Sequence, residues 1–428
     1  MRKWVLAAVI SSFLTSLYAQ PAYDEIQENV LLSASNYRAY PGPTQRKLTP
    51  APRGYKPFYL SHYGRHGSRF HSKPSLYNNP YKTLLKADSL GKLTATGKDV
   101  LRRVSIIRHD AENRWGDLTP LGAQQHQDII RRMYKRFPEV FKDSADVDAR
   151  STGVGRCVLS MEYALMQLTR LNPALKIHQD ATHRDIYYLN LQDKELFNLR
   201  NSKKATQAYN EFKSRHSDCS HLMQTLFNDS NYVRQHIHSY DLAEQLMLVA
   251  AIMQNVELGK SMTLFDIFTK DETYQIWKNG NAWWYIGWGG SETTDSKMPY
   301  LQRNLLRKMI QQADSCILQP KTNVHLRFGH ETVVLPLLCL LDLNGFGLVT
   351  DDLEQLEAKG WINYHAFPMG SNVQFIFYRK SPADRDPLFK VLLNENEATL
   401  PLHTDQPPYY RWSDFRKYYL NKLDAYED

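Results

Sequence analysis

The sequence predicts an α/β fold, in which a mainly parallel sheet core is flanked by helices and carries a mostly α-helical insertion domain. Two observations lead to this prediction. Three segments share one order of features: a short strand-like run, then a sharp polar turn, then a helix-like run. Strands that alternate with helices are typical of a parallel sheet. In addition, residues 155–300 are rich in helix formers and poor in the alternation typical of strands.

The polar turns of the three segments are expected to meet at one edge of the sheet. The strand-like runs and the turns that follow them are residues 58–63 and 64–69, 146–149 and 150–153, and 324–328 and 329–331. Ligands of such sheets bind beyond the carboxyl ends of the strands. The turns can therefore form one site although they lie far apart in the sequence.

The remaining elements complete the predicted domain organisation. Thr119 can cap a helix that has Pro120 at its first position. Residues 373–378 and 389–393 are expected to form two strands that return to the core sheet. We predict an α/β core from residues 21–154 and 301–428, interrupted by a mostly helical insertion at residues 155–300.

The first twenty residues are predicted to be a secretory signal peptide. Arg2 and Lys3 precede a mostly apolar run, and Ala19 offers a small residue for cleavage. A membrane anchor is the alternative, but the run is shorter than the ~18 residues that a spanning helix needs. No later apolar stretch is long enough to span a membrane. We therefore expect an exported protein without a membrane span, periplasmic or secreted into the medium.

Export would place the four cysteines in an oxidising compartment. They are Cys157, Cys219, Cys316 and Cys339. Four cysteines allow three complete pairings, and the sequence does not choose among them or exclude buried free thiols.

The composition excludes some classes of protein and favours anionic partners. Hydrophobic residues make up 42% and charged residues 23% of the 428 residues, so global disorder is excluded. Only 20 glycines and 20 prolines are present, which excludes a collagen-like architecture. Removal of Arg2 and Lys3 with the signal peptide would lower the net charge from +8 to +6. A basic protein favours phosphorylated small molecules, nucleic acid or acidic lipid as partners.

The segment Arg65-His66-Gly67-Ser68-Arg69 gives the strongest functional signal. Arginine presents a planar fork of donors that suits phosphate oxygens, and histidine can be a neutral nucleophile near pH 7. Gly67 permits a sharp turn and a close backbone approach. A surface cluster that forms ion pairs is the alternative, but such a motif occurs by chance in well under ~1% of chains of this length.

With other segments of the chain, this pentapeptide resembles the signature of the histidine acid phosphatases, the branch that includes phytases and multiple inositol polyphosphate phosphatases. The other segments similar to family motifs are Leu118-Thr119-Pro120-Leu121-Gly122 with Gln125-His126, Arg150-Ser151-Thr152 with Arg156 and Ser160, and Phe328-Gly329-His330-Glu331-Thr332. The resemblance extends over about residues 55–400 in the family's order.

The resemblance implies a role for each site residue. Phosphate oxygens are bound by Arg65, Arg69 and Arg150. His66 attacks phosphorus to form a phosphohistidine, and His330 donates a hydrogen bond to the phosphate. Glu331 protonates the leaving alkoxide and then activates water. No metal or other cofactor is required, because the arginines neutralise the phosphate charge. The helical insertion is expected to cap this active site.

Glu331 departs from the usual family pattern. Typical acid phosphatases and many phytases have His-Asp in the distal motif, and the animal inositol polyphosphate enzymes have His-Ala-Glu. Here glutamate follows His330 directly, and its longer side chain needs a different rotamer to act as the proton donor. Glu331 could instead orient the site while water or substrate supplies the proton. It could also be an acid that the helix dipole favours.

Three more residues are weaker candidates for substrate contact. His71 follows the signature closely, and His183 with Arg184 could bind a second phosphate. A solvated charged turn is the alternative for His183 and Arg184. The histidines of the chain show no recognisable metal-ligand spacing, so no metal site is expected.

Three functions are compatible with these features. The first is an exported phosphomonoesterase acting on inositol polyphosphates, above all phytate. The second is a broad-specificity acid phosphatase with small phosphomonoesters as substrates. The third, a binding protein for phosphate or nucleic acid without chemistry, is disfavoured because His66 and Glu331 are both present. No basic stripe interleaved with aromatic residues suggests nucleic acid as a partner.

Overall fold

The computed structural model describes residues 20–191, 193–319 and 322–427. The predicted signal peptide lies outside the described residues, apart from Gln20. Within the described ranges, no helix combines the length and the apolar character that crossing a bilayer requires.

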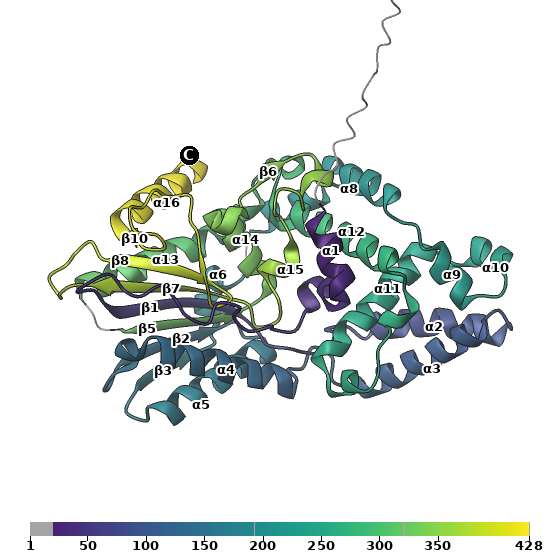
Figure 1. Cartoon of the computed structure of the whole chain (residues 1–428), viewed down its shortest axis with the longest axis horizontal. Helices are drawn as coiled ribbons and strands as arrows, with labels where there is room; N and C mark the ends of the chain where they lie inside the picture. Colours follow the sequence, from purple (N-terminus) through teal and green to yellow (C-terminus); the bar gives the residue numbers. More distant parts are fainter. Residues whose placement is uncertain (1–19, 192, 320–321, 428) are drawn as a thin grey trace, which may run out of the picture.

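The described residues form an eight-stranded sheet. It lies between helices in the left part of the molecule as seen in Figure 1. Its order is β10-β8-β7-β1-β5-β2-β3, and β9 pairs with β8. Its strands are β1 (Lys56–Arg65), β2 (Asp146–Ser151), β3 (Lys176–Asp180), β5 (Val324–Gly329), β7 (Asn372–Arg379), β8 (Leu388–Leu393), β9 (Asn396–Ala398) and β10 (Tyr410–Arg411). β1, β5, β2 and β3 run parallel, whereas β7 to β10 attach antiparallel. The predicted α/β fold and its five predicted strands are confirmed.

The register of the parallel strands brings the three polar turns together. Arg65 of β1 lies opposite Gly329 of β5, and Ser151 of β2 lies opposite Phe328 of β5. Beyond the ladder, the His66 amide donates to the Gly329 carbonyl over 2.9 Å. The three turns therefore leave the sheet at its carboxyl edge, as the sequence predicts.

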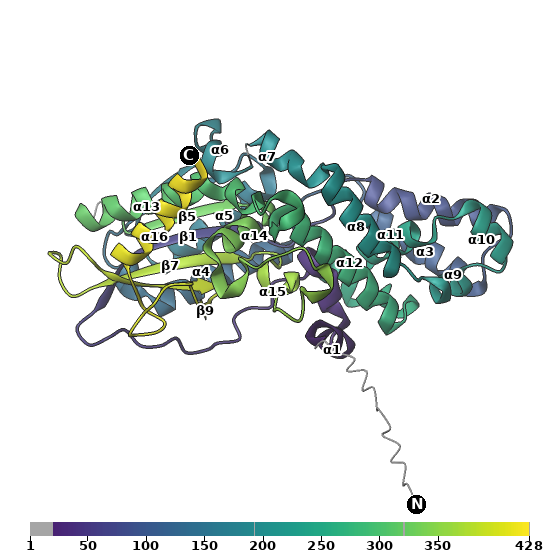
Figure 2. The same cartoon turned by 90° about the horizontal axis from the view of Figure 1, so that it is seen from above.

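Helices cover both faces of the sheet (Figures 1 and 2). On one face lie α4 (Pro120–Arg136) and α5 (Gly155–Leu171). On the other lie α13 (Arg303–Leu318), α14 (Glu331–Leu341) and α16 (Trp412–Glu427). A buried apolar cluster fills each interface, with residues such as Ile130 and Leu165 on the first side and Leu338 and Leu306 on the second. The predicted start of α4 is confirmed, because the Thr119 hydroxyl accepts from the Gly122 amide over 3.2 Å.

A helical lobe extends from one end of the sheet (Figure 1). Its helices are α2 (Ser75–Ser89), α3 (Ala95–Asp110), α8 (Lys203–Arg215), α9 (Ser220–Leu226), α10 (Ser230–His236), α11 (Ser239–Ile252) and α12 (Lys270–Trp288). The N-terminal α1 (Pro21–Glu28) packs against α12. Shorter elements are α6 (Ile186–Leu189), α7 (Lys194–Asn198), α15 (Asn363–Ala366) and a two-stranded pair of β4 (Gly290–Ser291) with β6 (Val349–Thr350).

The predicted domain boundaries differ from the structure in two places. The insertion does not begin at residue 155, because α5 packs on the sheet and β3 is one of its strands. β3 is an edge strand with mostly exposed, polar residues, so its sequence lacks an apolar strand pattern. Conversely, α2 and α3 share a hydrophobic core with α9 and α11, so part of the predicted core region belongs to the lobe.

The four cysteines are buried free thiols. Burial raises the pKa of Cys157 to about 11 and that of Cys219, Cys316 and Cys339 to about 12. Of the alternatives left open by the sequence, the structure has thiols rather than disulfides.

Candidate active site

The turn after β1 is held by the helices that follow the other motifs. The Gly67 amide donates to Ser160 Oγ of α5 over 3.1 Å, and the Ser68 amide donates to Gln125 Oε1 of α4 over 2.9 Å. Ser68 Oγ donates to Asn255 Oδ1 over 2.7 Å. The Leu-Thr-Pro-Leu-Gly segment and Gln125 therefore hold the turn in place through its backbone.

Two glycines allow this packing. A Cβ atom on Gly67 would lie 2.4 Å from the carbonyl oxygen of Gly122, and one on Gly122 would lie 2.2 Å from the carbonyl oxygen of Ser68. Any side chain at either position would collide with backbone. The close approach predicted for Gly67 is thus its contact with Gly122, near the start of α4.

His66 is fully buried, and its ring is oriented by its own turn. Its Nδ1 lies 2.9 Å from the carbonyl oxygen of Gly67. A carbonyl oxygen only accepts hydrogen bonds, so Nδ1 holds the proton and Nε2 keeps its lone pair. Burial lowers the pKa of His66 well below its ordinary value, and the nearby Glu331 carboxylate only partly opposes this. His66 is therefore a neutral imidazole with Nε2 available for attack.

Two signature arginines have donors that no described residue satisfies. Arg65 donates from Nη1 to the carbonyl oxygens of Asn36 and Phe367, over 2.5 and 2.8 Å, but its buried Nη2 has no partner there. Arg69 donates from Nη1 to Phe70 over 2.9 Å, and its buried Nε is likewise unsatisfied. Burial lowers the pKa of Arg65 to about 10, so it remains charged. Unsatisfied buried donors on cationic groups favour binding of an anion.

Arg156 is the third arginine of this cluster. It lies in the first turn of α5, and its buried Nε has no partner among the described residues. Burial and then the charge of Arg69 lower the pKa of Arg156, while the Glu331 carboxylate opposes this. Its charge therefore interacts with those of Arg69 and Glu331.

Arg150 is not part of the cluster, which corrects its predicted role. Its guanidinium pairs with Asp148 at 2.5 Å, Asp180 at 3.3 Å and Asp185 at 3.8 Å. On a strand, residues two apart share a face, so Arg150 points to the same side of β2 as Asp148. Arg156 lies beyond the end of β2, in α5. The two arginines therefore differ in their surroundings because β2 ends between them.

Glu331 and His330 complete the cluster from the start of α14. Glu331 Oε2 lies 3.0 Å from Arg65 Nε and 3.6 Å from His66 Nε2, and Oε1 lies 3.9 Å from Arg69 Nη2. Burial favours the protonated form of Glu331, but the positive charges of Arg65 and Arg69 oppose it, and the pKa is held well below its ordinary value.

His330 is oriented differently. Its Nε2 lies 3.3 Å from Thr152 Oγ1, and its ring centroid lies 5.8 Å from that of His66. Burial lowers the pKa of His330 to about 4, so it is neutral at pH 7 and can donate a single hydrogen bond.

Sequence reasoning missed Asn36. Its carbonyl oxygen accepts from Arg65, and its Nδ2 donates to Glu331 Oε1 over 3.4 Å. It comes from a 3-10 segment, Val30–Tyr37, that precedes the signature and contains no recognisable motif. No pattern in the sequence could have identified it.

The weaker candidates lie outside the cluster. His71 is buried, its Nε2 lies 2.8 Å from the Leu248 carbonyl oxygen, and burial lowers its pKa to about 3. His183 and Arg184 form an exposed turn after β3, where Arg184 pairs with Asp185 at 3.2 Å. Their surroundings are those of a solvated charged turn, the alternative given above for these two residues.

The electrostatics of the cluster favour an anion over a metal ion. Ligand atoms of His66, His330 and Glu331 lie within 4.8 Å of one another, a grouping that could hold a cation. However, Arg65 and Arg69 both approach the only carboxylate of the three. Their positive charges repel a cation at this place and attract phosphate.

A cavity of about 710 Å³ adjoins the cluster. Its lining includes Arg69, Glu331 and Thr332, together with residues of α8, α11 and α12 in the helical lobe. Helices of the lobe therefore line the cavity beside the cluster. His66 does not line the cavity and has no exposed surface, whereas Glu331 does line it.

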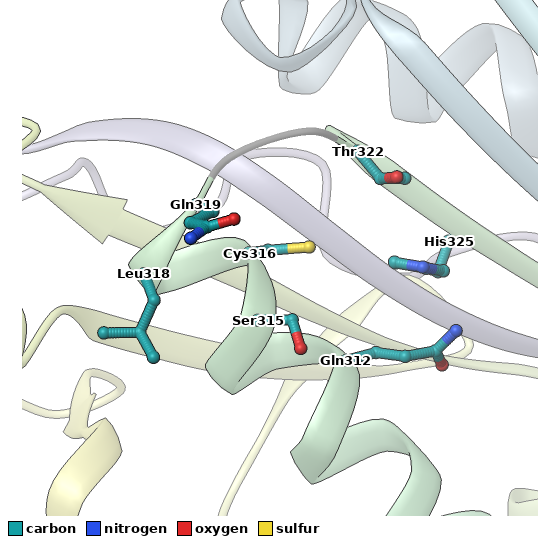
Figure 3. A pocket seen from close by; sticks show the side chains of 7 residues that line it. All are labelled: Gln312, Ser315, Cys316, Leu318, Gln319, Thr322 and His325. Atoms are coloured by element: carbon teal, nitrogen blue, oxygen red, sulfur yellow. The ribbon is translucent and has the colours of Figure 1, made fainter.

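A second cavity, of about 440 Å³, lies at the amino end of β5 (Figure 3). Its lining includes Gln312 and Cys316 of α13 and His325 of β5, and the described residues that line it include no arginine or lysine. His325 Nδ1 is hydrogen-bonded to the Tyr59 hydroxyl over 2.9 Å. This cavity is at the end of the sheet opposite the arginine cluster, so we do not assign it to the same site.

Comparisons with known proteins identify the family and the fold of the chain. The sequence model of the histidine phosphatase superfamily (branch 2) matches residues 64–394. A multiple inositol polyphosphate phosphatase from Bifidobacterium longum, solved with inositol hexasulfate, has a similar fold. Its TM-score is 0.76 at 18% identity, with 90% of this chain and 96% of that chain covered.

Two phytase structures are also similar. The D. castellii phytase has a TM-score of 0.69 at 15% identity, over 95% of this chain and 90% of that one. The apo Hafnia alvei phytase has a TM-score of 0.51 at 16% identity, over 87% and 98%. At these identities the likeness shows a shared fold. No curated protein sequence matches the chain.

Proposed function

Because the chain belongs to the histidine phosphatase superfamily (branch 2), we propose that it is a phosphomonoesterase that works through a phosphohistidine on His66. The observation that supports this most directly is a buried neutral histidine, with Nε2 unprotonated, among three arginines that have unsatisfied donors. This arrangement provides a nucleophile and an oxyanion-binding site at one place.

In the first step, Nε2 of His66 attacks phosphorus, and the bond from phosphorus to the ester oxygen breaks. The free donors of Arg65, Arg69 and Arg156 bind the non-bridging oxygens, whose charge they stabilise in the transition state. His330 donates a hydrogen bond to the same phosphoryl group. In the second step, water attacks the phosphohistidine, and inorganic phosphate leaves with His66 restored.

Glu331 is proposed to give its proton to the departing alkoxide and to take one from water in the second step. In the free protein its low pKa makes it an anion, paired with Arg65. A bound phosphate dianion would compete for the arginines and repel this carboxylate. Both effects raise the pKa of Glu331 and favour its proton-donating form. Because His66 has no exposed surface, the Glu331 side chain must also move aside as the phosphate enters.

Inositol polyphosphates are the proposed substrates, phytate among them. The similarity of the fold to a multiple inositol polyphosphate phosphatase and to phytases supports this choice. So does the basic charge of the chain. A broad-specificity acid phosphatase acting on small phosphomonoesters is the alternative, which the aromatic lining of the cavity favours. We further propose that residues 1–20 direct export to the periplasm or the medium.

The experiment is a trapping assay with an aryl phosphate. Wild-type protein, quenched during turnover, should carry acid-labile phosphate on a peptide containing His66. The His66→Ala variant should lose this label and all turnover, whereas the control His183→Ala, at an exposed turn, should keep both. Phosphate release by His66→Ala at the wild-type rate would contradict the proposal. Chromatography of the products from phytate would then identify the substrate class and the first position attacked.

A further inference from the structure

Six of the residues that line the cavity beside the cluster are aromatic. Four tryptophans of α12 lie along it, Trp277, Trp283, Trp284 and Trp288. The ring centroids of Trp284 and Trp288 are 4.4 Å apart, and those of Trp283 and Trp288 are 4.8 Å apart. Trp283 is 41% exposed, so part of this wall is open to a ligand. Aromatic walls pack against the apolar face of a ring rather than against phosphate groups.

Few cationic side chains are available beyond the catalytic end. Besides Arg69, the lining contains Lys73 and Lys213. Lys213 already lies 3.8 Å from Asp241 and over the Tyr240 ring at 4.4 Å. Each phosphate group has a charge of about −1.5 to −2 near neutral pH. A ring with a phosphate on every carbon would therefore meet too few counter-charges in this cavity.

Glu244 places a carboxylate in the same cavity. It lies on α11, is half-buried, and lines the cavity together with Tyr209 and Lys213 of α8. Its carboxylate forms no hydrogen bond or ion pair with any residue that the structure describes. Burial raises its pKa, while the more distant charge of Lys213 opposes this rise. Glu244 is thus an acceptor without a donor among the described residues, and it lines the same cavity as Arg69 and Glu331.

Resting on the phosphomonoesterase activity proposed above, we propose that Glu244 selects ring substrates that keep a free hydroxyl at its position. The carboxylate accepts a hydrogen bond from that hydroxyl and repels a phosphate group there. The tryptophan wall packs against the face of the ring. Inositol hexakisphosphate has no free hydroxyl to offer this carboxylate, whereas partly phosphorylated inositols do. Partly phosphorylated inositols are therefore better substrates.

The test compares kcat/KM for an inositol trisphosphate and for inositol hexakisphosphate. Wild-type protein should prefer the trisphosphate. Glu244→Gln keeps the shape of the side chain, removes its charge and adds a donor, so the ratio of the two values should fall about tenfold. The control Glu257→Gln changes an 80% exposed glutamate of the same lobe and should keep the wild-type ratio. An unchanged ratio in Glu244→Gln, or a wild-type preference for the hexakisphosphate, would overturn the inference.

A second measurement needs no variant of Glu244. During digestion of inositol hexakisphosphate by wild-type protein, lower phosphates should be consumed as fast as they form and should not accumulate. Accumulation of a tetrakis- or trisphosphate as the main product would contradict the role of Glu244. Hydrolysis of an aryl phosphate tests the proposed phosphomonoesterase by itself. If that activity is present and the ratio fails to respond, only the selectivity is refuted; if it is absent, the proposed function fails.

Discussion

Nε2 of His66 lies 3.6 Å from Oε2 of Glu331, and the same carboxylate oxygen lies 3.0 Å from Arg65 Nε. The carboxylate is thus the counter-ion of the signature arginines in the free protein. A phosphate that binds to these arginines takes over this role and lies between the proposed nucleophile and the proposed acid. The contact explains how a glutamate with a depressed pKa can serve as a proton donor once substrate is bound.

Replacement of Glu331 by glutamine should lower kcat on an alkyl phosphate by about 10²- to 10⁴-fold, the usual contribution of a general acid. The inhibition constant of inorganic phosphate should not rise, because the substitution removes a negative charge from the binding site. Steady-state kinetics with phosphate as inhibitor measure both effects. Near-wild-type turnover would refute the donor role and favour a purely orienting one.

Anion binding should be accompanied by proton uptake. Sulfate, which does not titrate near neutral pH, would compete for the arginines and raise the depressed pKa of Glu331 towards its ordinary value. Uptake should therefore grow as the pH falls towards about 4.3, the ordinary value for glutamate. Calorimetry in two buffers with different ionisation enthalpies measures it. Glu331→Gln should abolish this uptake; equal uptake in the variant would assign the proton to another group.

Arg156 and Arg150 should respond differently to replacement by alanine. Arg156→Ala removes a cation from the cluster and should lower kcat/KM for an aryl phosphate by about 10²-fold. Arg150→Ala leaves Asp148, Asp180 and Asp185 without their shared cation. It should destabilise the fold by about 1–3 kcal/mol and change kcat/KM little. Denaturant titration and kinetics on both variants distinguish the roles, and the reverse pattern would restore Arg150 to the site.

Gly67→Ala should disturb the site by a steric route. The new Cβ would lie 2.4 Å from the Gly122 carbonyl oxygen, so the turn with His66 must move away from α4. We expect a loss of about 1–3 kcal/mol in the free energy of unfolding and a fall in kcat. The control Gly280→Ala adds a Cβ that meets no atom within 4 Å and should leave the stability close to that of the wild type. Equal stability of the two variants would contradict the close contact.

The fold should lose stability in mild acid. Burial lowers the pKa of the six buried histidines of the described part, to about 4 or below where a value is given: His62, His66, His71, His126, His325 and His330. The unfolded chain binds protons at these groups below about pH 6.5, and the folded chain does not. Stability therefore rises with pH across this window and falls by about 1.4 kcal/mol per histidine and pH unit as the pH drops from about 6.5 towards 4.

Urea titrations at several pH values in this window measure the effect. The expected total is several kcal/mol. A free energy of unfolding that stays constant from neutral pH down to the pKa values of His126 and His330, about 4 each, would show that these histidines are accessible to protons in the folded protein.

The sequence by itself determined the α/β fold and the central part of the site. Strands of the core alternate with helices, and the rules of parallel sheets place their polar turns at one edge, so Arg65, His66, Arg69 and Glu331 could be expected to meet. Two arginines beside a histidine favour phosphate chemistry, so this part of the site could be predicted from the sequence alone.

Only the tertiary structure decided which other residues join the site. Arg150 and Arg156 lie six positions apart, and the point at which β2 ends directs one towards aspartates and the other towards the cluster of Arg69 and Glu331. Asn36 and Glu244 come from segments without a motif and reach the cavity through long-range packing. Such contacts depend on how elements far apart in the sequence pack together, and local sequence patterns do not predict that packing.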